Sequence, residues 1–417
     1  MTLQTDSKYR YWIALIIAII YIYYTAGKKI GDSSFAIISG LLFLSWLAFI
    51  FVFTNHKCNK IFNKKYLLLF VVLIYHFLTG LMVTPLLKQT IYTAELFLFF
   101  SPLIIYDYFK QIKSKKIFSL LTYSIIITLS IYSFRTIFYL IDHPLAARSM
   151  ISTEMDDDVT IGGGFALAYS LAIIVPCLFY ILTRQKKLFS KFNKTIIIAC
   201  IILFSITVFA SLFFIAILLM IFGCLFSLLI RENKKVFSVF SKVLIISALF
   251  YLLIGPIIGN FLIDSVYFSN PVIQQRSYEI GYTLSGRGSS ETEDLSARFN
   301  VYEESLKTFL RNPILGVGIK AGNNYNDLYA AGIGGHSDFL DYLGKFGLMG
   351  CIPLFYFLFQ CYKENANSNL VNLAWLIFII SAILNPIMSF TEFLVLTLLI
   401  PLINNLQFNS ETENILL

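Results

Sequence analysis

The chain of 417 residues is 58% apolar and 13% charged, whereas soluble domains average about 45–50% apolar and about 25% charged residues. With a mean hydropathy of +0.76, these values exclude an ordinary soluble enzyme, a disordered chain and a disulfide-rich secreted domain. We interpret the net charge of +8 as a result of basic cytoplasmic loops, which membrane proteins favour, rather than as a sign of nucleic-acid binding.

Apolar runs long enough to cross a bilayer predict an all-α integral membrane protein with about twelve transmembrane helices. The first run begins at Tyr11 and is expected to remain as a helix, because no small-residue cleavage site follows it. The long run at 195–230 predicts a tight hairpin of two helices. The predicted spans are 11–26, 33–53, 66–84, 91–109, 117–141, 161–183, 195–210, 211–230, 236–259, 337–362, 369–386 and 387–405.

The basic residues predict the orientation of these helices. With the N-terminus placed inside, twenty of the 32 basic residues fall in the inside segments or, in the case of Lys242, near the inner end of the span 236–259, so both termini are predicted on the cytoplasmic side. Residues 1–259 then hold the first nine transmembrane helices. Residues 260–336 form a large extracytoplasmic loop that is expected to carry the active site, and residues 337–417 hold the last three helices and the cytoplasmic C-terminus.

The large loop contains a predicted amphipathic helix. Ser296 is placed to cap this helix and Asn312-Pro313 to end it, while Glu303 and Lys307 have the i,i+4 spacing of an ion pair. Such a helix at a membrane surface needs lipid head groups or other helices against its apolar side. The predicted apolar side consists of Phe299, Tyr302, Leu306, Phe309 and Leu310.

A histidine stands where the chain is expected to re-enter the membrane. In GGHSDFLDYLGKFGLMG (334–350), His336 lies at the N-terminus of the predicted helix. Because the helix dipole disfavours an imidazolium there, a neutral ring could accept a proton from a hydroxyl group. The alternative is a histidine that only caps the helix at the interface.

Arginines gather in the predicted outside segments, and arginine suits bidentate binding of phosphates. Three charged residues fall in the outer halves of predicted spans: Arg135, Glu95 and Glu392. Either they have a function, or one of the two glutamates forms an ion pair with Arg135. His76 near the middle of its span is interpreted as a buried, hydrogen-bonded side chain. The outside arginines are Arg276, Arg287, Arg298 and Arg311 in the large loop and Arg148 in a smaller loop.

The order of these features resembles the O-antigen ligase and Wzy-type polysaccharide polymerase superfamily of bacteria. The resemblance rests on SARFNVYEESLKTFLRNPILGVG followed by GGHSDFLDYLGKFGLMG, and it covers about 50 residues. The family pattern is an Arg four residues before an aromatic, a Pro-x-x-Gly-x-Gly turn, and a His before a helix with Gly-x-x-Gly. It is matched here by Arg298, Tyr302, Pro313, Gly316, Gly318, His336, Gly347 and Gly350.

The resemblance implies a GT-C-like glycosyltransferase of the bacterial inner (plasma) membrane that acts on the extracytoplasmic face. It implies inverting transfer of a glycan from undecaprenyl diphosphate to an acceptor hydroxyl, with no metal ion and no other cofactor. His336 would be catalytic by orienting or deprotonating the acceptor, and Arg298 by binding the diphosphate leaving group. Many family members carry another Arg in the turn that corresponds to 208–216, which has no basic residue here. Further substrate-binding candidates are therefore Arg287, Arg276, Arg135, Arg148 and Tyr302.

Two functions within this chemistry stay open. The first hypothesis is a polymerase that joins lipid-linked repeat units into O-antigen, capsule or exopolysaccharide. The second is a ligase that moves a finished glycan to lipid A-core or to a protein. A secondary transporter is the alternative of another class, although no internal repeat pairs two halves of the chain. The expected partners are the undecaprenyl-diphosphate-linked donor and acceptor, the bilayer, a chain-length regulator and a flippase, and no nucleic acid.

Overall fold

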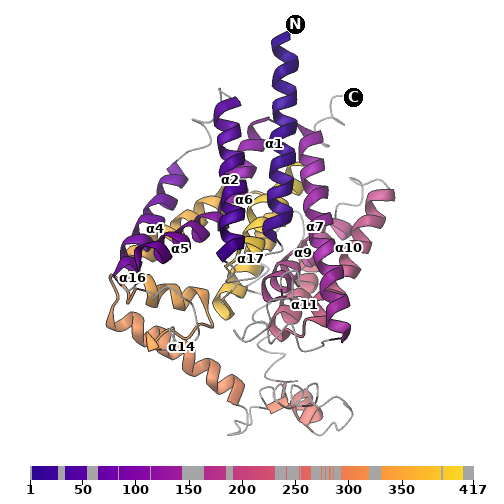
Figure 1. The fold of residues 1–417 in the computed structure, drawn as a ribbon. Helices are drawn as coiled ribbons and strands as arrows, with labels where there is room; N and C mark the ends of the chain where they lie inside the picture. Colours follow the sequence, from indigo (N-terminus) through magenta and orange to yellow (C-terminus); the bar gives the residue numbers. More distant parts are fainter. Residues whose placement is uncertain are drawn as a thin grey trace.

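The computed structural model describes residues 2–26, 33–53, 64–82, 84–112, 114–142, 164–184, 191–230, 255–263, 293–318, 330–386 and 388–406, with isolated positions between 241 and 285. All regular structure in these residues is helical (Figure 1). The elements are α1 (Thr2–Ala26), α2 (Ser33–Phe53), α4 (Lys64–Leu81), α5 (Leu86–Phe99), α6 (Ser101–Ile112), α7 (Lys115–Asp142), α9 (Gly164–Arg184), α10 (Lys191–Ala210), α11 (Phe214–Leu229), α14 (Glu293–Arg311), α16 (Asp338–Lys363), α17 (Asn369–Leu384), α18 (Phe390–Phe393) and the π-helix η1 (Leu394–Leu399).

The described helices are those of a multi-pass membrane protein. Five of them, within α1, α4, α7, α9 and α16, are long and apolar enough to cross a bilayer, and the bent pair α5–α6 makes a sixth if it is one span. Shorter apolar helices lie at Ile37–Phe53, Lys194–Ala210, Ile215–Leu229, Asn369–Leu384 and Phe390–Leu406. The all-helical membrane fold is therefore confirmed. The count of twelve spans and the extracytoplasmic side of 260–336 stay predictions, and most of the predicted span 236–259 lies outside the described residues.

Helix α9 lies at the centre of the bundle. It packs against α10, α11 and α17, and all residues from Leu167 to Leu178 are buried. A helix that is apolar on every side can be enclosed in this way without leaving polar groups unpaired. The outer helices instead turn large apolar side chains such as Leu67, Ile127 and Ile202 outward, as expected for a surface that faces lipid.

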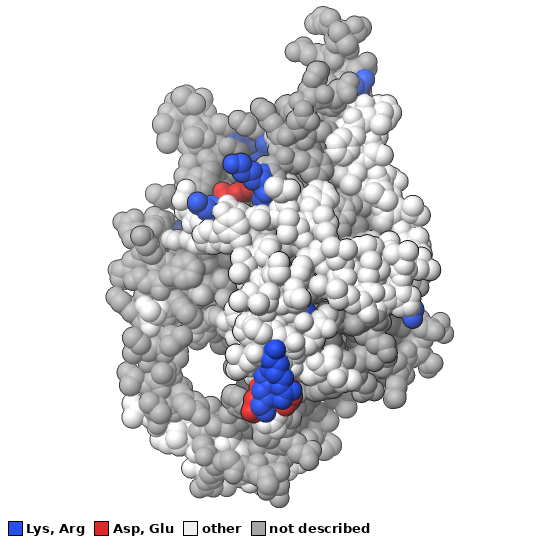
Figure 2. Space-filling model, turned by 90° about the vertical axis from the view of Figure 1, so that its left-hand side faces the viewer, with Lys and Arg blue, Asp and Glu red and all other residues white. Residues whose placement is uncertain are grey.

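Most of the described charged side chains on one face of the molecule lie in two groups, one in the upper part and one near the lower end, and the described surface between these groups is mainly uncharged (Figure 2). Lys65 of α4 pairs with Asp107 of α6 at 2.7 Å and with Glu364 at 2.8 Å. On α14, Lys307 pairs with Glu303 at 3.0 Å, as predicted. The hydrogen bond to Glu303, with the charges of Glu303 and Glu304, raises the pKa of Lys307. A mainly uncharged band between charged ends fits a bilayer, where charges are costly.

Helix α14 lies at the end of the molecule remote from the start of α1 and packs against α16 (Figure 1). The helix ends at Arg311, before Asn312-Pro313, as predicted. It begins at Glu293, however, so Ser296 lies inside the helix, and the prediction that it caps the helix was wrong. An additional helical turn therefore precedes the expected start.

The buried side of α14 also differs from the predicted apolar side. Val301, Ser305 and Thr308 are buried, whereas Leu306 and Leu310 are 43% and 65% exposed. The reason is that the partner of α14 is the backbone of a glycine-rich loop, which small and polar side chains can approach and hydrogen-bond. Spacing alone does not reveal such a partner.

Candidate active site

His336 lies in a short loop that α14 and α16 hold on both sides. The hydroxyl of Thr308 donates to the carbonyl of Gly332 at 2.6 Å. The amide of Gly334 donates to Ser305 Oγ at 2.8 Å, and the Ser305 hydroxyl in turn donates to Asp341 Oδ1 at 2.6 Å. Each buried polar group in this relay has a partner, which is the condition under which a buried network fixes a geometry.

Glycine allows the loop to lie directly against α14. A Cβ on Gly334 would stand 2.2 Å from the carbonyl oxygen of Val301, closer than any real contact, so no other residue fits without movement. Gly335 has a φ of +69°, a backbone conformation that L-residues rarely adopt. Glycine is therefore required at position 335 by the backbone conformation, and not by a chemical role.

The helix that follows begins directly after the histidine. Ser337 caps α16 by accepting from the amide of Leu340 at 3.3 Å, and the amide of Ser337 donates to Asp341 Oδ2 at 3.3 Å. The position of His336 just before the helix N-terminus is as predicted, and its side chain is half-buried. Asp338 and Asp341 fill the first turn, where carboxylates are favoured by the helix dipole.

A second contact between α14 and α16 is made by the turn 313–318. Helix α16 is broken at Gly347, which has a φ of 55° and a ψ of −166°. The amides of Val317 and Gly318 donate to the carbonyls of Gly344 and Lys345, both at 3.1 Å. The Pro-x-x-Gly-x-Gly turn is thus fixed to the break in α16.

The reverse bonds complete this contact. The amide of Leu348 donates to the carbonyl of Pro313 at 2.8 Å, and that of Met349 to Ile314 at 3.0 Å. The hydroxyl of Tyr75 on α4 adds a bond to Leu315 O at 2.7 Å. An unbroken helix would pair the amides of residues 348 and 349 with the carbonyls of 344 and 345, so the turn takes over all four of these groups.

Asp338 joins the histidine loop to the end of α17. Its Oδ2 accepts from the amide of Met388 at 2.6 Å, and its own amide donates to Asn385 O at 3.4 Å. Glu392 of α18 is fully buried and accepts a hydrogen bond from Ser389. The segment between α17 and α18 is therefore held against the first turn of α16.

The two predicted residues on α14 lie one turn apart. The hydroxyl of Tyr302 donates to the carbonyl of Leu384, the last residue of α17, at 2.9 Å, which gives Tyr302 a positional role whatever else it binds. Arg298 lies four residues earlier in α14, and its side chain is outside what the structure describes. The structure thus brings together the helix of Arg298 and the loop of His336.

Of the other predicted arginines, Arg135 lies within the described residues, on another element than His336 and Arg298. Arg135 is exposed on α7, where its guanidinium lies 5.9 Å from the ring centroid of Tyr132, and α7 packs against α1 and α10. Their roles in substrate binding stay predictions. Arg148, Arg276 and Arg287 lie outside the described residues.

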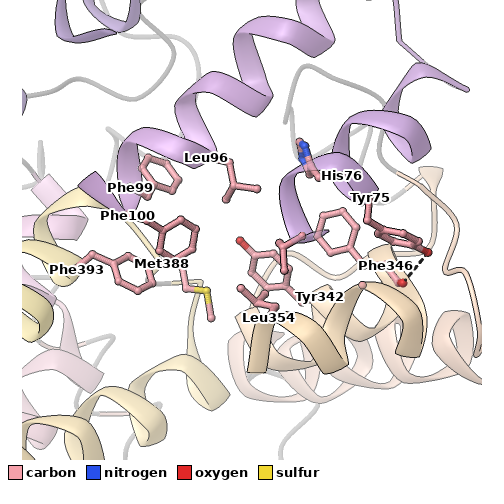
Figure 3. A pocket seen from close by; sticks show the side chains of 12 residues that line it. Tyr75, His76, Leu96, Phe99, Phe100, Tyr342, Phe346, Leu354, Met388 and Phe393 are labelled. Carbon is pink, nitrogen blue, oxygen red and sulfur yellow. Dashed lines mark hydrogen bonds between the residues drawn. The ribbon is translucent and has the colours of Figure 1, made fainter. Parts of the chain in front are cut away.

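A small, mainly apolar cavity lies between α4, α5, α16 and α18, with Phe100 after α5 and Met388 before α18 also in its lining (Figure 3). The hydroxyl of Tyr342 points into it from α16. His76 lies on α4, with Nδ1 3.2 Å from Thr93 Oγ1, so the prediction of a hydrogen-bonded histidine is confirmed. The lining residues are Val72, Tyr75, His76, Leu96, Phe99, Phe100, Tyr342, Phe346, Gly350, Leu354, Met388 and Phe393.

Three residues of this region were missed from the sequence: Ser305, Asp341 and Lys345. Asp341 and Lys345 are charged residues inside the predicted span 337–362, and a charge within a span is a recognised signal of function. Ser305 gives no such signal, because a serine on a helix at a membrane surface is ordinary.

Residues 198–355 match the family model described as O-antigen ligase. The matched segment contains Arg298, Tyr302, the turn 313–318, His336 and Gly347. A comparison with curated proteins found no match. This match supports the resemblance to the superfamily of O-antigen ligases and Wzy-type polymerases that was inferred from the sequence, for the domain at 198–355.

Proposed function

We propose that this protein is a polysaccharide polymerase of the bacterial inner membrane. It transfers a glycan from undecaprenyl diphosphate to a hydroxyl of a second lipid-linked repeat unit, on the extracytoplasmic face. The product is a longer chain of repeat units for O-antigen, capsule or exopolysaccharide. The proposal is supported by the family match over 198–355 and by the multi-pass helical fold.

His336 and Arg298 would divide the chemistry between them. The acceptor oxygen bonds to the anomeric carbon of the donor sugar while its proton passes to the neutral ring of His336. The bond from that carbon to the diphosphate oxygen breaks, and its electron pair leaves on undecaprenyl diphosphate. The guanidinium of Arg298 offsets the charge that grows on this leaving group. Diphosphate is a good leaving group, so a base and a cation suffice.

One observation carries this assignment. The loop of His336 is bonded to α14, the helix of Arg298, through Ser305 and Thr308, and α14 is bonded again to α16 through the turn 313–318. The bonds of Ser305 and Thr308 and the bonds of the turn 313–318 together hold α14 and α16 as one unit. Precise placement of a base and a charge clamp is what such a transfer requires.

Glycan profiling of a deletion strain tests the proposal. The strain is complemented with wild type, His336→Ala or Arg298→Ala, and the amount of each protein in the membrane is measured. We expect a ladder of chain lengths with wild type and a single repeat unit with either variant, a loss of about 100-fold or more for a general base or a charge clamp.

Lys307→Ala is the matched control, since it removes an exposed cation from the same helix, and exposed ion pairs contribute little. It should give the wild-type ladder. Wild-type ladders from both His336→Ala and Arg298→Ala would refute the proposal and make a transport assay the next step.

A ligase is the second candidate, because the matching family model is described as O-antigen ligase. The same profiles separate the two. A ligase variant would leave long chains on undecaprenyl diphosphate, with none on the final acceptor, whereas a polymerase variant leaves single repeat units.

A further inference from the structure

Lys345 is a lysine in the N-terminal half of a transmembrane helix. It is half-buried on α16, between Gly344 and Phe346, two turns after the start of the helix. It lies within electrostatic reach of Asp338 and Asp341 on its own helix and of His76 on α4. A cation so placed is costly without an anionic partner.

The neighbouring carboxylates do not form ion pairs with Lys345. The described ion pairs join Lys65 with Asp107 and Glu364, and Lys307 with Glu303 and Glu304. The oxygens of Asp338 and Asp341 instead accept bonds from Met388 N, from the Ser305 hydroxyl and from Ser337 N. In the part of the chain that the structure describes, the ammonium is thus left without a bonded carboxylate.

The side chain of Lys345 runs toward the end of α16 that carries His336. Its Nζ lies 5.9 Å from the ring centroid of Tyr342, one turn earlier. Helical side chains lean toward the N-terminus in this way. Because the side chain reaches back by one helical turn, its ammonium lies about 8 Å along the helix axis from the histidine loop. A diphosphate and its attached sugar can bridge this separation.

We propose that Lys345 binds the diphosphate of the lipid-linked donor, as a second cation beside Arg298. The inference rests on the proposed function. A lysine suits this place because its ammonium is a compact charge on a flexible stem and is an established phosphate ligand.

The carboxylates of Asp338 and Asp341 help to position the ammonium of Lys345. Asp338 and Asp341 attract the ammonium, yet the bonds that they accept from the backbone and from Ser305 keep them directed elsewhere. The lysine is therefore kept close to the site while its own hydrogen-bond donors stay available to an anion.

The test uses the full-length protein in lipid nanodiscs. Transfer is measured while the donor and the acceptor are varied separately, with inorganic diphosphate as a competitor. For Lys345→Met we expect the KM for donor and the inhibition constant of diphosphate to rise about tenfold or more, the worth of one charged hydrogen bond. The KM for acceptor should not change, and Lys345→Arg should restore most of the affinity.

A second readout does not depend on turnover. Diphosphate should raise the unfolding temperature of wild type and of the control Lys307→Met but not that of Lys345→Met, because a ligand stabilises only the state that binds it. Equal diphosphate affinity in wild type and Lys345→Met would overturn the inference, even where kcat falls. A wild-type protein that binds diphosphate through Lys345 yet transfers no glycan would instead refute the proposed function.

Discussion

At the scale of single residues, Ser305 connects the histidine loop to the helix that follows it. Its hydroxyl oxygen accepts from Gly334 N at 2.8 Å and its hydrogen goes to Asp341 Oδ1 at 2.6 Å. Both neighbours are buried, so neither finds water if the serine is removed. Together with Thr308, this side chain therefore holds the loop of His336 against α14.

Ser305→Ala is expected to destabilise the protein by about 1–3 kcal/mol, because it leaves a buried amide and a buried carboxylate oxygen without their partner. Glycan transfer should slow as well, since the loop of His336 loses one of its two side-chain bonds to α14. Thermal unfolding and a transfer assay on the same preparation check both effects. Leu306→Ala is the adjacent control at a 43% exposed position and should stay within about 0.5 kcal/mol. Wild-type behaviour of Ser305→Ala in both assays would contradict the positioning role.

At the scale of elements, the break in α16 depends on Gly347. A Cβ there would lie 2.4 Å from Ile314 O, and the φ of 55° with ψ of −166° belongs to a region that essentially only glycine occupies. Gly316 is under the same restriction from the other side, since its Cβ would lie 2.3 Å from Lys345 O. The two glycines allow the turn and the helix to approach at backbone distance.

Gly347→Ala should cost about 1–3 kcal/mol from backbone strain alone, with the collision at Ile314 in addition. We expect a lower unfolding temperature and weak or absent transfer, measured on protein purified in detergent. Gly40→Ala on α2 is the control, because a Cβ there meets nothing within 4 Å; alanine should leave stability unchanged or raise it by up to about 1 kcal/mol. If Gly347→Ala were as stable and active as the control, the break in α16 would not matter.

At the scale of the whole molecule, α16 joins two polar regions. Its first turn lies in the candidate active site, and Glu364 directly after its last residue accepts from Lys65. Lys65 is 3% exposed and also contacts Asp107, which accepts from the Tyr66 hydroxyl at 2.6 Å. The buried ion group ties α4, α6 and α16 together at the end of the molecule away from α14.

Lys65→Met should lower the free energy of unfolding by about 3–5 kcal/mol, since it leaves two carboxylates without their buried cation. Adding Asp107→Asn should recover part of this loss, because one uncompensated charge is then gone. Chemical unfolding curves of the single and double variants, beside the exposed control Lys307→Met, measure the difference. A double variant no more stable than Lys65→Met would show that charge pairing is not what the group supplies.

The sequence predicts where apolar helices lie better than it predicts where they break. The predicted span 91–109 is two helices that meet at Phe100, and the span 337–362 bends at Gly347. Apolar runs are visible because the bilayer selects them residue by residue. The bend at Gly347 depends on bonds to a turn about thirty residues away, and no local pattern contains that partner.

In the candidate site, too, residues in a local sequence pattern can be predicted, whereas residues that depend on distant partners cannot. The sequence singles out His336 and Arg298 as candidates because they stand in a recognisable order with the glycines and the proline. Ser305 was missed because its importance comes from the two groups it joins. The buried side of α14 was assigned to the wrong residues, because spacing identifies apolar positions and not the hydrogen bonds that a glycine-rich loop offers to Ser305 and Thr308.

The exchange of hydrogen bonds at Gly347 bears on how the protein assembles. Alone in lipid, α16 has an alternative at Gly347, an unbroken turn in which the amides of Leu348 and Met349 return to the carbonyls of Gly344 and Lys345. Opening those two bonds in the bilayer is costly until the turn 313–318 arrives to replace them with four. We therefore expect the bend at Gly347, and with it the geometry around His336, to form late in folding, after insertion, when the turn 313–318 docks against α16.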